Sequence, residues 1–192
     1  MHELIEKALE NYYHEIENHE LIKNGNFEYG DAILYYCLIK EAKPNKLVEL
    51  GCGSSTHIAS LACDNITVID MRDDIDKLGF DKKVKIIHSK FEDVDFGFIK
   101  EFKENDIVFI DNNHTAENIE HFIKETHLKI NRGVLVHFHD MNVGYASDEI
   151  RIIRELLKTD CYEILYDPDK DKLVTRYPKF RDHEGSMWVG RK

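Results

Sequence analysis

The sequence predicts an α/β protein of 192 residues with a doubly wound, mostly parallel sheet. One support is a series of five short, almost continuously apolar runs, typical of strands that helices cover on both faces. These runs are LVEL (47–50), ITVID (66–70), VKIIH (84–88), DIVFID (106–111) and VLVHFHD (134–140). The other support is that helical segments separate the runs, and this alternation is typical of βαβ units with parallel strands.

Helices are expected before the first strand and between the strands. Apolar residues recur at helical spacing over residues 2–22, and residues 29–42 form a second helix that ends before Pro44. Further helices are expected near 55–63, 74–78, 93–103, 115–128 and 148–158. We therefore expect a single domain, with an N-terminal helical cap at 1–44 and the core of the fold at 45–192.

The pattern changes after residue 160, where three apolar runs follow closely on one another. They are YEILY (162–166), KLVTRY (172–177) and SMWVGRK (186–192), separated by the turn residues DPDKD and RDHEG. Such spacing predicts a strand pair or hairpin added at one edge of the sheet.

Composition and charge exclude several classes of function. The formal net charge of −11 disfavours binding to a phosphate backbone, so we expect a small-molecule partner and no nucleic acid. The apolar runs are too short to span a bilayer, and the acidic N-terminus does not look like a signal peptide, which predicts a cytoplasmic protein. The four cysteines form no C-x-x-C pair and are expected to be buried thiols.

The most informative motif is VELGCGSST, which begins at Val48 at the end of the first predicted strand. Gly51 and Gly53 allow a tight turn with close approach of the backbone to a ligand, and Ser54 and Ser55 can cap the helix that follows. Thr56 stands where a dinucleotide-binding turn has its third glycine, which weakens a pyrophosphate site. A tight turn that binds nothing is the alternative interpretation of the two glycines alone.

Two acidic residues flank this turn. Glu49 lies two residues before Gly51, where a carboxylate repels pyrophosphate but accepts a hydrogen bond from a cationic or ribose-bearing ligand. Asp70 ends the next strand, nineteen residues after Gly51, close to the spacing at which an acid binds ribose hydroxyls. Together they favour a ribosylated ligand without a pyrophosphate.

The motif VELGCGSST and the strand ITVID resemble the first two motifs of class I S-adenosylmethionine-dependent methyltransferases. The resemblance implies a Rossmann-like, seven-stranded sheet whose final strand is antiparallel, here SMWVG. It also implies that S-adenosylmethionine is the cofactor. The residues expected to contact it are Glu49, Gly51, Gly53, Ser54, Ser55, Asp70, Met71, Phe91 and Asp111, with Ser89 and Lys90 as further candidates.

Polar residues follow the fourth and fifth predicted strands, in IDNNHT and HFHD. Because the carboxyl ends of parallel strands share one edge of the sheet, Asp111, His114, His139 and Asp140 are expected to meet there as catalytic residues. An imidazole or carboxylate at this place can act as general base, and Asp111, His139 and Asp140 could instead hold a metal ion. His137 is expected to be a packed histidine.

The pair IDNNHT and HFHD is similar to the acid–histidine pattern of sugar and other small-molecule O-methyltransferases, related to macrolide-sugar methyltransferases and cephalosporin-hydroxylase-like proteins. The resemblance implies O-methylation of a small polar molecule. Members of that group often bind Mg2+, but His139 replaces a carboxylate found in some of them, so base catalysis by His139 or His114 stays open. Two other classes stay open as well: a metal-dependent hydrolase or hydroxylase, and a non-catalytic module that binds S-adenosylmethionine or a nucleoside. The N-terminal helices could also pair two chains into a homo-oligomer.

Overall fold

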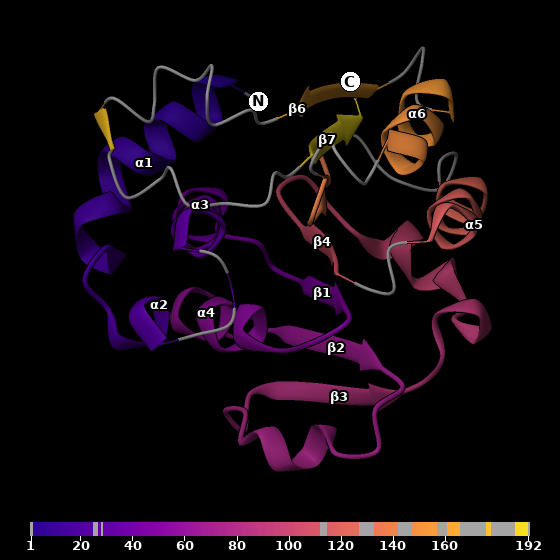
Figure 1. Cartoon of the computed structure of the whole chain (residues 1–192), viewed down its shortest axis with the longest axis horizontal. Coiled ribbons are helices and arrows are strands. Elements are labelled where there is room, and N and C mark those ends of the chain that lie inside the picture. Colours follow the sequence, from indigo (N-terminus) through magenta and orange to yellow (C-terminus); the bar gives the residue numbers. More distant parts are fainter. Residues whose placement is uncertain are drawn as a thin grey trace.

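The computed structural model places a twisted sheet between two layers of helices (Figure 1). The residues that the structure describes are 2–24, 27, 29–111, 115–126, 133–141, 147–156, 161–165, 176–177 and 187–191. Their strands are β1 (Leu47–Leu50), β2 (Ile66–Asp70), β3 (Val84–His88), β4 (Ile107–Ile110), β5 (Leu135–Phe138), β6 (Cys161–Leu165) and β7 (Met187–Arg191).

These described strands form one seven-stranded sheet in the order β3-β2-β1-β4-β5-β7-β6. The neighbours from β3 to β5 are parallel, with Leu47 of β1 beside both Ile66 of β2 and Ile107 of β4. Strand β7 runs antiparallel to both β5 and β6. The strand order reverses between β1 and β4, and ligands of open α/β sheets bind in the crevice at that point.

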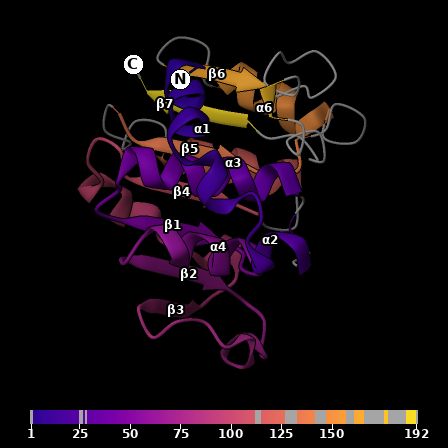
Figure 2. The ribbon, with the colours of Figure 1, turned by 90° about the vertical axis from the view of Figure 1, so that its left-hand side faces the viewer.

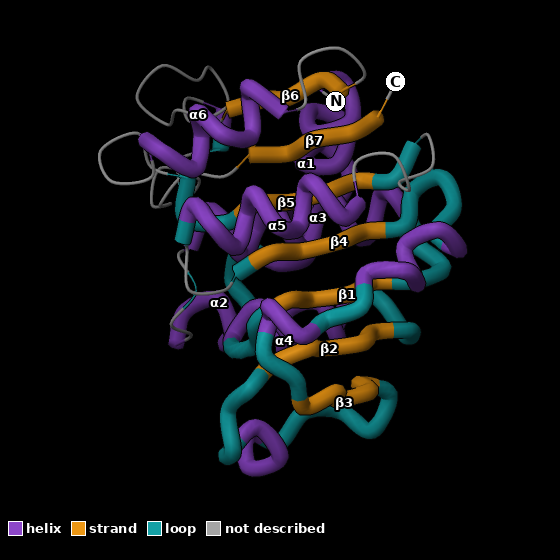
Figure 3. The backbone as a smooth tube through the Cα atoms, turned by 90° about the vertical axis from the view of Figure 1, so that its right-hand side faces the viewer, coloured by secondary structure: helices purple, strands orange, loops and turns teal. Residues whose placement is uncertain are grey.

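Helices cover both faces of the sheet. Figure 2 shows the face carrying α1 (His2–Ile16), α2 (Glu20–Asn24), α3 (Tyr29–Ala42) and α4 (Ser54–Ala62), and Figure 3 shows α5 (Ala116–Thr126) and α6 (Ser147–Leu156) on the other. Alternate residues of β1 point to opposite faces, so Leu47 joins the core under α3 while Val48 and Leu50 join the core under α5. The first of these cores also contains residues of α1 and α3, which ties the N-terminal helices to the sheet.

The structure confirms the α/β class predicted from the alternating runs and the Rossmann-like fold that the resemblance implies. The predicted bounds of β1, β2, β3 and α3 agree with the observed ones. His137 is fully buried, with its ring 4.8 Å from that of Phe109, which confirms the expected packed histidine. Cys37 and Cys63 are buried free thiols, as expected, whereas Cys52 is half-buried.

Three predicted helices differ from the observed ones. The helix expected near 74–78 is a 3-10 helix, η1 (Ile75–Leu78). The single helix expected at 2–22 is wrong, because α1 ends at Ile16 and the ring of His19 accepts the backbone N–H of Leu21 to begin α2. The helix expected near 93–103 is replaced by two 3-10 helices, η2 (Phe91–Asp93) and η3 (Phe96–Glu101). Asp95 separates them because its carboxylate accepts the N–H of Gly97 at 2.8 Å and starts a new turn. None of the described helices has the length and apolar character needed to cross a bilayer.

Candidate active site

The glycine turn joins β1 to α4 at the carboxyl edge of the sheet. Gly51 has a φ of 94°, a left-handed conformation in which a side chain is strained. Gly53 has an extended φ of 170°, and a Cβ atom there would meet no other atom within 4 Å. Glycine is therefore required by the backbone at 51, whereas at 53 it keeps the space of an adjoining cavity open.

Asp70 ends β2 beside this turn. Its Oδ2 accepts the backbone N–H of Cys52 at 3.0 Å, and its Oδ1 accepts that of Arg72 at 2.8 Å. The guanidinium of Arg72 also pairs with it, with Nε 3.2 Å from Oδ2. Burial acts to raise the pKa of Asp70, but the hydrogen bonds from Arg72 and Cys52 overcome it and lower that pKa. Asp70 is thus held as a carboxylate at the cavity wall.

Glu49 lies behind the turn and is fully buried. Its Oε1 accepts the hydroxyl proton of Tyr35 at 2.9 Å, and its Oε2 accepts that of Thr56. Burial raises the pKa of Glu49 to about 7, although both hydrogen bonds act in the opposite direction. Glu49 lines neither of the two cavities at this edge, which argues against the direct ligand contact expected from the sequence. It instead ties β1 to α3 and α4.

A cavity of about 560 Å³ lies between the glycine turn, the end of β2 and the segment after β3. Its lining includes Gly51, Asp70, Met71, Ser89, Phe91 and Asp111. These residues, which were all expected to contact the cofactor, lie together at one concave surface, whereas Lys90 does not line it. Phe91 lines this cavity, and its half-buried ring also packs 5.5 Å from that of Phe96 in the core.

A second cavity of about 420 Å³ adjoins the first on the side of α4. Its lining includes Gly53, Ser54, Ser55, His57 and His139. The two cavities share four lining residues, which are Cys52, Arg72, Asp111 and Asp140. The edge of the sheet therefore offers two adjoining compartments separated by acidic and basic side chains.

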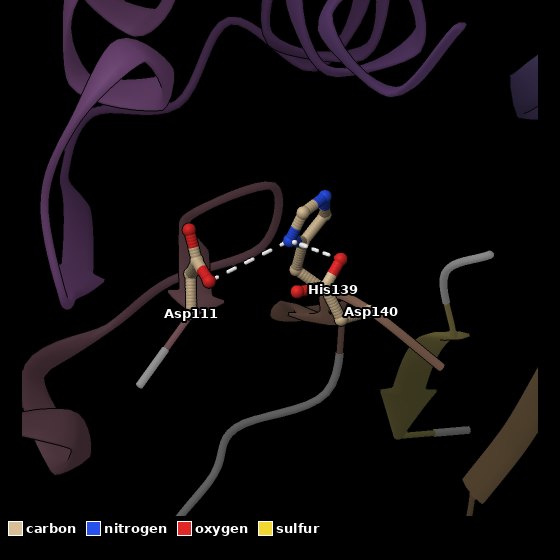
Figure 4. A group of neighbouring side chains, drawn as sticks. All are labelled: Asp111, His139 and Asp140. Atoms are coloured by element: carbon tan, nitrogen blue, oxygen red, sulfur yellow. Dashed lines mark ion pairs between the residues drawn. The ribbon is translucent and has the colours of Figure 1, made fainter. Parts of the chain in front are cut away.

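Asp111, His139 and Asp140 come together at the shared wall (Figure 4). The Nδ1 atom of His139 lies 3.5 Å from Oδ1 of Asp111 and 3.1 Å from Oδ1 of Asp140. One ligand atom from each of the three side chains can be chosen so that all lie within 4.8 Å of one another. Asp140 has a φ of 54°, a left-handed conformation uncommon outside glycine, and this local backbone turns its carboxylate toward the ring.

The imidazole of His139 is only 3 % exposed and has a third acidic neighbour. Its Nε2 lies 3.7 Å from Oδ2 of Asp31 in α3, a carboxylate that is 1 % exposed. Burial acts to lower the pKa of His139, but the Asp111 and Asp31 carboxylates overcome it and raise that pKa well above its ordinary value. These carboxylates therefore favour the protonated ring, and in its protonated form the ring can neither accept a proton nor bind a cation.

Several residues at this edge were not expected from the sequence, among them Asp31, Arg72 and Phe27. Asp31 is the one charged residue in the run YGDAILYYCLI, and a lone acid in a buried helix is a detectable sign of a polar partner. The sequence gives no comparable indication for Arg72 or Phe27. Arg72 reaches the site from the turn after β2, and the ring centroid of Phe27 lies 4.8 Å from that of His139. The predicted catalytic residue His114 lies outside the described residues.

Residues 48–141 match the sequence profile of a family described as a methyltransferase domain. This segment includes the glycine turn, Asp70 and the Asp111–His139–Asp140 cluster. Residues 48–141 are thus similar to a methyltransferase domain. No curated protein matches the chain significantly in sequence.

Several solved structures of methyltransferases share the fold of this chain over nearly its whole length. The SAH-bound methyltransferase PaMTH1 of Podospora anserina has a TM-score of 0.61 at 12% identity, over 96% of this chain and 88% of its own. An O-methyltransferase of Bacillus cereus in complex with SAH has a TM-score of 0.60 at 11% identity, over 97% and 91%. The O-methyltransferase TomG of Streptomyces achromogenes, in complex with SAM, has a TM-score of 0.59 at 14% identity, over 99% and 90%.

Proposed function

We propose that the methyltransferase domain uses S-adenosylmethionine and methylates an oxygen atom of a small polar molecule. The observation that carries this proposal is the pair of adjoining cavities, which share Asp111 and Asp140 at their common wall. One compartment has the ribose-binding acid Asp70 and apolar side chains, as an adenosyl group requires. The other has room for the amino-acid end of the cofactor at Gly53 and for an acceptor beside the acidic cluster. The SAM- and SAH-bound proteins of the same fold support the choice of cofactor.

The cofactor residues divide by the part of the ligand that each would hold. Asp70 would accept hydrogen bonds from the ribose hydroxyls, and Phe91 and Met71 would enclose the adenine ring. The open space at Gly53 and the N-terminus of α4, at Ser54 and Ser55, suit a carboxylate. Asp111 lies where it can pair with an ammonium group of the same ligand.

The chemistry requires a positioned acceptor that can lose its proton. When bound, S-adenosylmethionine supplies a methyl group activated by its sulfonium. Transfer to an acceptor oxygen would break the carbon–sulfur bond as the new carbon–oxygen bond forms, and the hydroxyl proton would have to pass to a base. Asp111 and Asp140 are partly exposed carboxylates at the shared wall and can orient the hydroxyl and receive this proton. On the sequence alone, His114 is a further candidate base.

The cluster also fits a divalent cation. Adjacent ligand atoms of an octahedral ion lie roughly 3 Å apart. The distances from His139 Nδ1 to the two carboxylates, 3.1 and 3.5 Å, are close to this value. Two carboxylates and one imidazole suit Mn2+ or Fe2+ as well as Mg2+. A bound cation would lower the pKa of an acceptor hydroxyl. His139 would first have to release its Nδ1 proton, so that binding of the cation and loss of a proton are coupled.

We further propose that the whole chain forms one domain, with 1–44 as a helical cap on the core at 45–192. The first hydrophobic core supports this, because side chains of α1 and α3 share it with those of β1, β2 and β4. The net charge of −11 supports a small-molecule acceptor and no nucleic acid.

The first test is isothermal titration calorimetry with S-adenosylmethionine and with its demethylated product, each with and without Mg2+. Micromolar binding of both is expected. Asp70→Asn should weaken both by at least tenfold, because a neutral amide accepts weaker hydrogen bonds from two ribose hydroxyls. Asp64→Asn is the matched control, since that exposed carboxylate pairs only with Lys83 among the described contacts.

Three outcomes would contradict the proposal. If the unaltered protein binds neither S-adenosylmethionine nor its demethylated product, the cofactor assignment is refuted. A reaction that continues without the cofactor but stops with a chelator would favour a metal-dependent hydrolase or hydroxylase. Tight binding with no methyl transfer to any hydroxylated acceptor would favour a binding module.

A further inference from the structure

Asp31 is a buried acid that the methyltransferase match does not include. It lies in the first turn of α3, seventeen positions before the matched segment begins at Val48. Its carboxylate is 1 % exposed, and its Oδ2 atom is 3.7 Å from Nε2 of His139. A carboxylate at this depth needs a polar or charged partner to offset the loss of water. The imidazole supplies one.

The ring of His139 is fixed from two opposite sides. Asp31 faces Nε2, while Asp111 and Asp140 face Nδ1. In Figure 4 the second ring nitrogen points away from both of these carboxylates, toward the ribbons of the N-terminal helices. If the ring turned over, Nδ1 would leave the cluster and a carbon atom would take its place.

Aromatic packing restrains the plane of the ring but not its direction. The ring centroid of Phe27 lies 4.8 Å from that of His139, and the centroid of Phe109 lies 5.8 Å away. Neither phenyl ring distinguishes a nitrogen from a carbon of the imidazole by hydrogen bonding. The carboxylates, by contrast, distinguish the two ring orientations, because they face the two nitrogen atoms.

We propose that Asp31 is a positioning residue that holds His139 with Nε2–H toward α3 and Nδ1 toward Asp111 and Asp140. This inference rests on the proposed function, because it gives a residue of the N-terminal cap a supporting role in the same active site. It holds whether His139 binds a cation or donates a hydrogen bond, since both need Nδ1 at the cluster. Carboxylate–histidine pairs orient metal-binding imidazoles in this way in other proteins.

The test is long-range 1H–15N NMR of the imidazole rings, with the His139 signals identified by their loss in His139→Gln. In the unaltered protein, Nε2 of His139 should carry a slowly exchanging proton. In Asp31→Asn this proton should exchange rapidly or the ring should show a second orientation. If the ring signals of Asp31→Asn match those of the unaltered protein, the positioning role is refuted. Should that variant fail to fold, Asp31→Ser gives the same comparison with a smaller side chain.

Asp106→Asn is the matched control. Asp106 is equally buried at 1 % exposure, but it accepts backbone N–H groups of Asn45, Lys46 and Lys103 at the opposite edge of the sheet. Its substitution should leave the His139 ring signals unchanged even if the protein becomes less stable. A change of equal size in the control would mean that the His139 signals report general loosening, and would overturn the assignment to Asp31.

Two titrations separate this inference from the proposed function. Asp31→Asn should bind Mn2+ 10- to 100-fold more weakly than the unaltered protein, with unchanged affinity for S-adenosylmethionine. Equal Mn2+ affinity in both proteins would count against Asp31. If the unaltered protein binds neither ligand, the proposed function fails, while the NMR comparison still decides whether Asp31 orients the ring.

Discussion

Glu49 should make the stability of this protein depend on pH in a direction opposite to that of most acids. Its carboxyl group is fully buried between Tyr35 and Thr56, and burial raises its pKa to about 7 from an ordinary 4.5. Between these two values the folded protein holds a proton that the unfolded chain has released. The free energy of unfolding therefore falls as pH rises through this window, and levels off above about pH 7.

The size of the effect follows from the difference between the two pKa values. At about 1.4 kcal/mol for each pH unit, this difference corresponds to roughly 3 kcal/mol. Glu49→Gln removes the titration but keeps the shape of the side chain and an oxygen that can accept a hydroxyl proton. Relative to this variant, the unaltered protein should lose about 3 kcal/mol between pH 4.5 and pH 8.

Urea unfolding followed by circular dichroism at several pH values measures this difference directly. Glu101→Gln is the control, because Glu101 is an exposed partner of Lys46 and should show no such fall. If the unaltered protein and Glu49→Gln give parallel curves of unfolding free energy against pH, Glu49 does not hold a proton in the folded state. The assignment of burial as the dominant influence on this carboxyl group would then be refuted.

Three further predictions concern the site. Gly53→Ala should change the unfolding free energy by less than about 0.5 kcal/mol, because the new methyl group points into open space. The same methyl group should weaken S-adenosylmethionine binding at least tenfold. Equal affinity of the variant and the unaltered protein in calorimetry would contradict this. His139→Gln should lose Mn2+ binding but keep an affinity for S-adenosylmethionine within about twofold of that of the unaltered protein. If the variant binds neither Mn2+ nor S-adenosylmethionine, His139 belongs to the cofactor site. Asp140→Gly should abolish Mn2+ binding. Its unfolding free energy should be unchanged or raised by up to about 1 kcal/mol, since glycine tolerates a φ of 54°. A clear loss of stability in urea unfolding would contradict the second expectation.

The sequence predicts the sheet well because the signals for its strands are local. The bounds of β1, β2 and β3 follow from short apolar runs next to turn residues. The position of Asp70 relative to Gly51 is likewise set by the length of one βα unit, so both residues were expected to line one cavity and do. The helices deviate where a single polar side chain interrupts the periodicity, as His19 does before α2 and Asp95 before η3.

The sequence by itself determined the α/β class, the glycine turn and the meeting of Asp111, His139 and Asp140, because parallel strands bring their carboxyl ends to one edge. Only the tertiary structure decided what surrounds these residues. It buried Glu49 against two hydroxyl groups instead of exposing it to a ligand, and it placed Asp31 against His139. The physical reason is that such contacts join elements far apart in the chain, and they depend on which helix covers which face of the sheet. Periodicity records only that a helix has a buried face, whereas packing selects the partner of each residue on it.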